Sequence, residues 1–303
     1  MPIGKHEVTI VLPTLNEEEA IGPVIDELKA EGFSNILVID GYSTDRTVSI
    51  AKEKGARIVY QHGSGKASAI KTGIEHASTP YILIMDADFT YDAKDAWKFL
   101  EHADRYDEVI GFRIDRNNIP RLNRLGNWLI TKAFNLLTGS SLKDVCSGMY
   151  MLKAERARSL DIGSPGSGFG IEAEIAMQIS ATGDIAEVPI GYRRRLGSPK
   201  LKPLRDGFAI MATIFSLAKT YNPSFLFAIL TGLAFVPGIA IYAWTLYRLL
   251  FLGVWHSGWA LLGTALIILG GQGLILSMVS LLMKRMEKRI IQTLKSGHKG
   301  EET

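Results

Sequence analysis

Two aspartates separated by one alanine are the residues best suited to chemistry in this chain. Asp86 and Asp88 directly follow the apolar run 81–85, which reads Tyr-Ile-Leu-Ile-Met. Two carboxylates at positions i and i+2 around a bend reach one hard cation together. Mg²⁺ or Mn²⁺ held in this way bridges a diphosphate and neutralises the charge on a leaving group. Because an isolated Asp-x-Asp is common in surface turns, its position after an apolar run is what predicts a metal and diphosphate site.

Two further polar groups follow or precede regular segments. Asp40 comes after the apolar run 36–39, where its carboxylate can accept from a base N–H or a ribose hydroxyl, although Asp-Gly also makes simple turns. Gly65-Lys66 opens a helical segment and resembles half of a phosphate-binding loop. A complete ATPase loop needs glycine at position 60 and serine or threonine at position 67, where Tyr60 and Ala67 stand. This excludes the ATPase interpretation and leaves Lys66 as a residue expected near a diphosphate.

The segments that position these residues alternate between two periodicities. Short apolar runs typical of strands lie at residues 8–12, 36–39, 56–60, 81–85 and 108–111. Helical spacing occurs between them, at residues 17–29, 45–54, 66–76 and 92–102. The alternation predicts an α/β fold with a mostly parallel sheet covered on both faces. Ligands bind such sheets beyond the carboxyl ends of the strands, so we expect Glu17, Asp40, Asp86 and Asp88 to share one site.

Two later segments are amphipathic. Residues 120–137 combine apolar residues at helical spacing with Arg121, Arg124 and Lys132, and residues 204–221 repeat the pattern. Each is either a helix docked on the domain core or a helix lying in the membrane interface. For 204–221 we favour the interface, because this segment leads directly into an apolar span.

The C-terminal third indicates a membrane anchor. Residues 222–247 and 249–283 contain no charged side chain, and each stretch exceeds the roughly 20 residues that cross a bilayer, so we expect a transmembrane helical hairpin within 222–284. Basic residues lie on both flanks, in 193–205 and in the tail 285–303, whereas the turn 252–257 carries no Lys or Arg. The positive-inside tendency predicts a multi-pass cell-membrane protein with its N-terminal domain and tail in the cytoplasm. The first residues show no cleavable signal peptide, which agrees with that expectation.

Composition excludes several other classes. The chain of 303 residues is 47% hydrophobic, and its formal net charge of +3 is too small to indicate nucleic-acid binding. Cys146 is the only cysteine, which excludes an intramolecular disulfide and argues against a cysteine-built zinc site. We expect Cys146 to be a small packed side chain. The six histidines show no metal-ligand spacing.

Five segments, in this order and spacing, resemble family 2 glycosyltransferases with a GT-A fold. They are the strand and Pro-Thr-Leu-Asn-Glu of 8–17, Asp40–Thr47, Gly65-Lys66, Asp86-Ala87-Asp88, and Asp144-Val145-Cys146-Ser147-Gly148. The agreement runs from Val8 to about Leu201. Within the family the chain is most similar to the polyprenyl- or dolichyl-phosphate hexose synthases, and segments 40–45, 88–91 and 168–174 are similar to archaeal dolichyl-phosphate sugar synthases.

The resemblance implies a GT-A domain over residues 1–203 and a role for individual residues within it. It assigns the nucleotide sugar to Pro13, Glu17, Asp40, Lys66, Asp86, Arg195 and Lys200. It assigns the metal to Asp86 and Asp88, and the lipid phosphate to Arg113, Ser147 and Arg121 or Arg124. Asp88 and Arg113 are the residues that it ties most directly to catalysis. Glu172 and Glu174 either orient the acceptor site or cap a helix.

Several positions depart from the family pattern and bear on the donor. Gly41 stands in place of a common second aspartate, Ala67 in place of a glycine, and Pro199 in place of a serine. Thr90 stands where mannose-transferring relatives often have a glutamine as a further metal ligand. The resemblance to the archaeal subgroup favours UDP-glucose or UDP-N-acetylglucosamine as donor, with GDP-mannose as the runner-up.

The resulting hypothesis is a metal-dependent transfer of one hexose from a nucleotide-diphosphate sugar to dolichyl or polyprenyl phosphate, for protein glycosylation or cell-envelope glycans. The family implies inversion at the anomeric carbon. A lipid phosphate is already anionic near pH 7 and needs positioning more than a strong base, which agrees with the lack of a Ser-His-Asp pattern. A homo-oligomer is compatible with the sequence.

Two alternatives remain. A processive polysaccharide synthase would need more membrane spans and a Gln-x-x-Arg-Trp motif, which does not occur here. A non-catalytic, membrane-tethered nucleotide-sugar-binding protein would not need both aspartates of the Asp86-Ala87-Asp88 motif, yet both are present.

Overall fold

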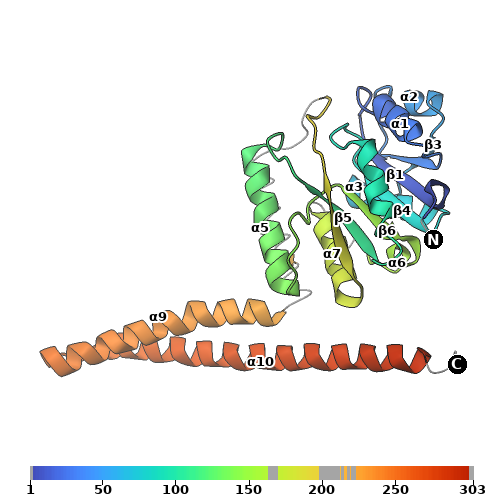
Figure 1. The fold of residues 1–303 in the computed structure, drawn as a ribbon. Helices are drawn as coiled ribbons and strands as arrows, with labels where there is room; N and C mark the ends of the chain where they lie inside the picture. The colour runs from blue at the N-terminus through green and yellow to red at the C-terminus, as the bar shows by residue number, and fades with distance from the viewer. Residues whose placement is uncertain are drawn as a thin grey trace. The chain divides into compact units, whose positions relative to one another are not determined.

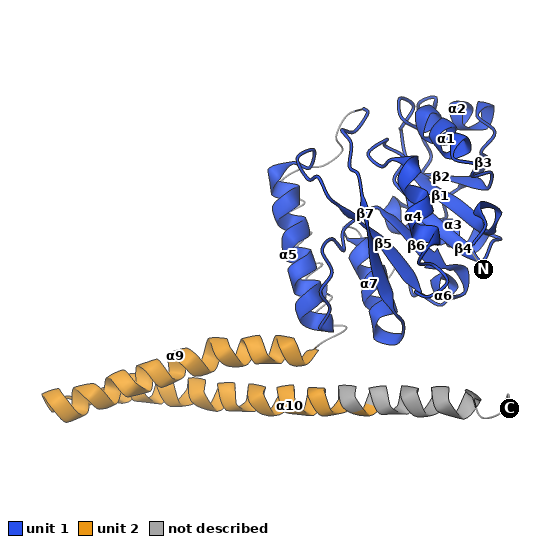
Figure 2. Ribbon diagram, viewed as in Figure 1, with its two compact units in different colours: residues 1–217 blue, residues 218–303 orange. Residues whose placement is uncertain are grey.

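The computed structural model describes residues 3–162, 170–197, 212, 215–216, 219 and 223–299. The chain divides into two compact units, Met1–Leu217 and Ala218–Thr303, coloured blue and orange in Figure 2. Three sequence-based expectations lie outside the described residues, almost entirely or completely: the interfacial helix at 204–221, the position of Lys200, and the side chains of the tail 285–303.

A seven-stranded sheet organises the first unit (Figure 1), and its strands, labelled in Figure 2, follow the order β3-β2-β1-β4-β6-β5-β7. The strands are β1 Val8–Thr14, β2 Ile36–Asp40, β3 Arg57–Tyr60, β4 Tyr81–Met85, β5 Glu108–Arg113, β6 Met149–Lys153 and β7 Ile185–Ile190. β1 to β4 pair in parallel and β7 is parallel to β5, whereas β6 runs antiparallel between β4 and β5. The α/β class with a mostly parallel sheet is confirmed, and β6 and β7 are strands that the apolar runs did not predict.

Helices cover both faces of this sheet. They are α1 Ile21–Ala30, α2 Thr47–Glu53, α3 Gly65–His76, α4 Ala96–Leu100, α5 Arg121–Thr138, α6 Ala154–Arg158 and α7 Ile171–Thr182, with 3-10 turns η1 Lys5–Glu7 and η2 Ala93–Asp95. Side chains alternate along β1: Ile10 shares a core with Ile25 of α1, whereas Val11 lies against Gly73 of α3. The two-sided covering that the periodicities predict is therefore observed.

The helix boundaries differ from the sequence expectations where side chains compete for backbone groups. The segment 45–54 becomes helical only at Thr47, because Oδ1 of Asp45 accepts the Thr47 backbone N–H (3.0 Å). Asp45 thus serves local structure. The segment 92–102 divides into η2 and α4, and the Asp92 side chain accepts from the Lys94 backbone N–H (3.0 Å) at the start of η2.

The strand register gathers the polar residues at one edge of the sheet. Thr14 is opposite Asp40, and Asp40 is opposite Tyr60, so β1, β2 and β3 end together. Met85, the last residue of β4, is opposite Met149, the first of β6. The residues after β4 therefore meet those before β6, which brings Asp86 and Gly148 side by side.

Two long apolar helices, α9 Pro223–Leu252 and α10 Ser257–Lys299, form the second unit. Glycines allow their close approach: a Cβ on Gly263 would lie 3.1 Å from the Tyr242 backbone nitrogen, and one on Gly270 only 2.7 Å from the Phe235 Cβ. Residues Pro223–Leu252 and Ser257–Met283 are each long and apolar enough to cross a membrane. Large apolar side chains on both helices point outward, including Leu233, Leu250 and Leu261. This exposure indicates membrane association, because the core helices of a soluble protein would bury such side chains.

Candidate active site

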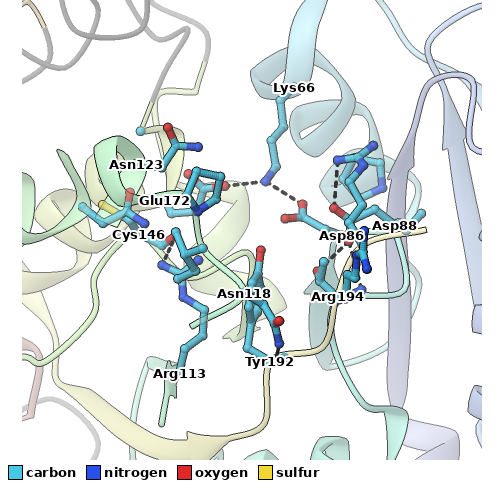
Figure 3. A pocket seen from close by; sticks show the side chains of 18 of the residues that line it. Lys66, Asp86, Asp88, Arg113, Asn118, Asn123, Cys146, Glu172, Tyr192 and Arg194 are labelled. Carbon is cyan, nitrogen blue, oxygen red and sulfur yellow. Dashed lines mark hydrogen bonds and ion pairs between the residues drawn. The ribbon is translucent and has the colours of Figure 1, made fainter. Parts of the chain in front are cut away.

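A cavity of about 620 Å³ lies beyond the carboxyl ends of the strands. One wall comes from the sheet edge and from the segment after β7, and it contains Pro13, Glu17, Lys66, Asp86, Asp88 and Arg195. The other wall comes from the end of β5 and the loop after it, from α5, from the start of α7 and from the first residues after β7. It contains Arg113, Asn118, Asn123, Asn127, Glu172 and Tyr192. Figure 3 shows members of both walls around the same space.

Asp86 and Asp88 are held in place by the segments on either side of them. The Asp86 backbone N–H donates to the Gly148 carbonyl (3.2 Å), and its carboxylate lies against Gly148, where a Cβ would come within 2.1 Å of Oδ2. A side chain at position 148 would therefore displace the Asp86 carboxylate. Oδ1 of Asp88 accepts from the Thr90 backbone N–H (3.2 Å) and hydroxyl (2.5 Å). Burial and the charge of Asp86 raise the pKa of Asp88, although Thr90 and Arg195 oppose the shift.

Lys66, in the first turn of α3, joins two carboxylates (Figure 3). Its Nζ lies 2.6 Å from Asp86 Oδ1 and 2.6 Å from Glu172 Oε1. Burial by itself lowers the pKa of Lys66, but the two carboxylates outweigh that effect and raise the pKa well above its ordinary value. Lys66 is therefore charged at neutral pH. Glu172 faces the cavity, whereas Glu174 is half-buried and does not line it.

Three consecutive arginines after β7 have three different surroundings. Arg193 anchors the segment: its Nη1 donates to Glu27 (2.8 Å) and its Nη2 pairs with Asp92. Arg195 reaches into the cavity, where its Nη1 donates to Asp88 Oδ2 (2.9 Å) and its Nη2 to Glu17. Arg194 also lines the cavity, is exposed, and has no side-chain partner in the part of the chain that the structure describes.

Arg113, at the end of β5, is buried and held from behind. Its Nε and Nη2 donate to the two oxygens of Asp144 (2.6 and 2.8 Å), and Nη2 also reaches the Cys146 carbonyl (3.2 Å). Asp144 is fixed in turn, because its backbone N–H donates to Glu187 of β7 (3.0 Å). Nη1 of Arg113 has no hydrogen-bond partner among the described residues and is free for an anion in the cavity.

Four residues that the resemblance assigned to the site do not line the cavity. Asp40 is fully buried at the end of β2, where one oxygen accepts the Ser43 backbone N–H (2.9 Å) and Oδ1 has no partner in the described structure. Ser147 is fully buried beside Met149. Arg121 is exposed and Arg124 half-exposed on the first turn of α5, next to Pro120 and Asn123, which do line the cavity. Their roles stay predictions.

The oxygen ligands that Asp86 and Asp88 offer fit a hard divalent cation. Asp86 and Asp88 present carboxylate oxygens to the same cavity, and Mg²⁺ is typically held by one or two carboxylates together with substrate phosphates. No group of three or more His, Cys, Asp or Glu side chains with metal-binding geometry occurs in the described ranges. A cation here would therefore take its remaining ligands from the diphosphate and water. Its charge would also offset the mutual repulsion of Asp86 and Asp88.

The sequence reasoning missed part of the cavity wall. Asn118, Asn123, Asn127, Tyr192 and Arg194 line it, yet none belongs to a motif with a recognisable spacing. For Arg194 a signal existed in the run 193–195, but the sequence does not reveal which arginine turns inward. Cys146 also lines the cavity; burial raises the pKa of its thiol, which agrees with a neutral, packed side chain.

Comparisons with known proteins agree with this geometry. The sequence profile of glycosyl transferase family 2 matches residues 9–159. Glycosyltransferase AglJ of Haloferax volcanii is 37% identical over 297 residues, which cover 93% of this chain and 97% of that protein. The chain belongs to glycosyltransferase family 2. A second relative from the same organism, a dolichyl-phosphate hexose transferase, is 34% identical over 214 residues, covering 69% of this chain and 92% of the relative.

A solved structure confirms the fold expected for this family 2 member. The crystal structure of glucosyl-3-phosphoglycerate synthase from Mycobacterium tuberculosis, in complex with Mn²⁺ and UDP-glucose, superposes with a TM-score of 0.57 at 22% identity, over 71% of this chain and 78% of that chain. The GT-A fold is therefore shown. The resemblance to dolichyl-phosphate sugar synthases is confirmed by the dolichyl-phosphate hexose transferase relative together with the family match.

Proposed function

We propose that this glycosyltransferase moves a single hexose from a nucleotide-diphosphate sugar to dolichyl or another polyprenyl phosphate. The observation that carries the proposal is that one cavity contains both the Asp86 and Asp88 carboxylates and the Arg113 guanidinium, on different walls (Figure 3). The carboxylates suit a metal-bound diphosphate, and the guanidinium suits a phosphate monoester. The name of the dolichyl-phosphate hexose transferase relative supports this acceptor and sugar class.

The sheet-edge wall binds the donor. Lys66 and Arg195 place two cations beside Asp86 and Asp88, where diphosphate oxygens can accept hydrogen bonds from them. Mg²⁺ or Mn²⁺, when bound by Asp86 and Asp88, neutralises the charge on the departing diphosphate. Pro13 and Glu17 line the same wall, and we assign the nucleoside to this side, towards Asp40. Lys200 is added to the residues that bind the nucleotide sugar by resemblance alone.

Arg113 orients the acceptor phosphate on the other wall. Asp144 fixes the plane of the guanidinium, and Nη1 donates to a phosphate oxygen. A second phosphate oxygen attacks the anomeric carbon, the bond from that carbon to the diphosphate oxygen breaks, and the nucleoside diphosphate leaves. One displacement inverts the anomeric configuration. Because the attacking phosphate is ionised already, positioning and charge compensation supply the catalysis, and no general base is required.

The outer face of α5 supports an acceptor that stays in the bilayer. The inner face is buried through Ile130, Phe134 and Leu137. The other face exposes a stripe of large apolar side chains, formed by Leu122, Leu125, Trp128, Leu129 and Leu136. With Arg121 and Lys132 exposed on the same helix, this is the composition of a helix that lies at the boundary of headgroups and acyl chains. We propose that α5 rests on the membrane that α9 and α10 span, with the catalytic unit and C-terminus cytoplasmic.

The donor is tested by direct transfer. Membranes containing the full chain are incubated with dolichyl phosphate, Mg²⁺ or Mn²⁺, and labelled UDP-glucose, UDP-N-acetylglucosamine or GDP-mannose in turn. We expect one donor, a UDP-sugar, to give label in the organic phase, with one sugar per lipid and no transfer after chelation. Products with several sugars per lipid would favour a processive synthase. Donor binding without transfer to any isoprenoid phosphate would favour the non-catalytic alternative.

A further inference from the structure

The part of the cavity wall contributed by α5 and α7 has an unusual composition for a site that binds phosphates. Asn123, Asn127 and Ile130 come from α5, and Ile171 and Glu172 come from α7. Amides and apolar groups suit a neutral, hydroxyl-rich ligand, because an amide both donates and accepts hydrogen bonds. Glu172 is the single charged residue among these five, and it is negative. This portion of the wall is therefore unsuited to a diphosphate.

Through Lys66, Glu172 lies close to Asp86, and therefore close to the expected position of the donor's sugar. Its Nζ is 2.6 Å from a carboxylate oxygen of Asp86 and 2.6 Å from one of Glu172, so the two carboxylates face each other across a single ammonium group (Figure 3). Asp86 belongs to the diphosphate end of the proposed donor. The group attached to that end is the sugar, and Glu172 is the nearest carboxylate on the opposite wall with which its hydroxyls can bond.

Glu172 is also built to stay in place as an acceptor. It is 9% exposed and lies in the first turn of α7, where the helix dipole favours a negative side chain. Lys66 occupies Oε1, while Oε2 has no hydrogen-bond partner among the described residues. An ionised carboxylate accepts hydrogen bonds and donates none, so it recognises hydroxyl groups and repels another carboxylate.

We infer that Glu172 is the residue that selects a neutral hexose and rejects a hexuronate at the donor sugar position. This inference rests on the proposed function, because it assumes a nucleotide sugar in the cavity. Sugar hydroxyls donate to Oε2 of Glu172, and Asn123, which lines the same part of the wall, adds a polar contact. The carboxylate of a hexuronate would meet the negative charge of Glu172 inside a partly desolvated cavity, where like charges repel strongly.

A purely structural role for Glu172 makes a different prediction. If Glu172 only positioned Lys66, its loss would weaken the binding of every ligand that carries the diphosphate, including a nucleotide without a sugar. If it contacts the sugar, its loss changes the affinity for the nucleotide sugar and leaves the affinity for the bare nucleotide nearly unchanged. The comparison of UDP with UDP-sugars therefore separates the two roles.

The test is calorimetric titration of the full-length protein in detergent with Mn²⁺ and no lipid acceptor. The ligands are UDP, UDP-glucose and UDP-glucuronate, and the proteins are wild type, Glu172→Gln and Glu174→Gln. Glu174 lies two residues further along α7 and does not line the cavity, so Glu174→Gln is the matched control. If the chain takes guanosine nucleotides instead, GDP, GDP-mannose and GDP-mannuronate replace the three ligands.

We expect the wild type to bind UDP-glucose about 10-fold or more tightly than UDP-glucuronate, because two like charges repel in a partly desolvated cavity. Glu172→Gln should narrow this ratio to about threefold or less with little change for UDP, and Glu174→Gln should match the wild type. Equal wild-type affinities for the two sugars, or an equal loss of UDP and UDP-glucose affinity in Glu172→Gln, would overturn the inference. Failure of every nucleotide sugar to bind would instead overturn the proposed function itself.

Discussion

The two walls of the cavity handle charge in different ways. On the sheet-edge wall each carboxylate shares a cation: Asp86 pairs with Lys66, and Asp88 and Glu17 pair with Arg195. On the facing wall Arg113 lines the cavity and pairs with the buried Asp144, which leaves its Nη1 without a hydrogen-bond partner among the described residues. The first wall can exchange partners when a metal and a diphosphate arrive. On the second wall Arg113 is preorganised for one anion, because its pairing with Asp144 need not change when that anion binds.

The largest expected effect comes from removing a carboxylate on the sheet-edge wall. Asp88→Ala takes away a metal ligand and a partner of Arg195, and we expect transfer to isoprenoid phosphate to fall at least about 10³-fold. The measurement is label in the organic phase, with membrane insertion of the variant unchanged. Asp104→Ala, at an exposed carboxylate away from the cavity, is the control. Undiminished turnover of Asp88→Ala would refute the metal assignment.

A smaller loss of transfer activity should follow when Arg113 on the facing wall is altered. Lysine at position 113 cannot pair with both oxygens of Asp144 and still offer a nitrogen to the cavity. We expect Arg113→Lys to lower kcat/KM for the lipid acceptor about 100-fold, with the donor affinity within about twofold of wild type. Steady-state kinetics with each substrate varied measure kcat/KM for the lipid acceptor, and donor titration measures the donor affinity. An equal loss of donor affinity would show that Arg113 belongs to the donor side.

The outward face of α5 should matter only when the acceptor is held in a bilayer. Leu125→Glu with Leu129→Glu places two charges on the exposed apolar stripe, and we expect transfer in vesicles to fall about fivefold to tenfold. Transfer to a short-chain, water-soluble polyprenyl phosphate should be unaffected, which is the internal control. A similar loss with both acceptors would contradict the membrane role and indicate damage to the cavity wall.

The smallest effect concerns the buried carboxyl group of Glu108. Glu108 begins β5, the strand that ends at Arg113; it is 1% exposed, its Oε2 has no hydrogen-bond partner in the described structure, and burial raises its pKa well above the ordinary value. Because the folded state disfavours the ionised form, stability is retained below the ordinary glutamate pKa. It is lost as the pH rises towards the raised value.

Glu108→Gln removes this titration. Between pH 5 and 8 we expect the Tm of the wild type to fall by about 2–4 °C more than that of the variant. Thermal unfolding in detergent at several pH values measures the difference. Parallel curves for the two proteins would show that Glu108 does not ionise on unfolding in this range.

Much of the donor wall could be predicted because its residues follow strands. Asp86 and Asp88 directly follow β4, and Lys66 opens α3, so local pattern and the rule that ligands bind at strand ends locate them together. The facing wall could not be predicted in the same way. Asn123 and Asn127 lie on a helix whose polar residues are distributed around it, and apolar periodicity does not tell which polar residue faces a cavity.

The sequence by itself determined the kinds of element, the acidic pair after β4 and the apolar hairpin, because hydrophobic periodicity and strand-end chemistry are local properties of the chain. Only the tertiary structure decided which distant residues meet. The antiparallel insertion of β6 between β4 and β5 brings Gly148 against Asp86 and, through the segment before β6, Asp144 against Arg113. Likewise α7 packs against α5, and Glu172 at the start of α7 meets Lys66 of α3. These contacts depend on sheet order and register, which no local pattern encodes.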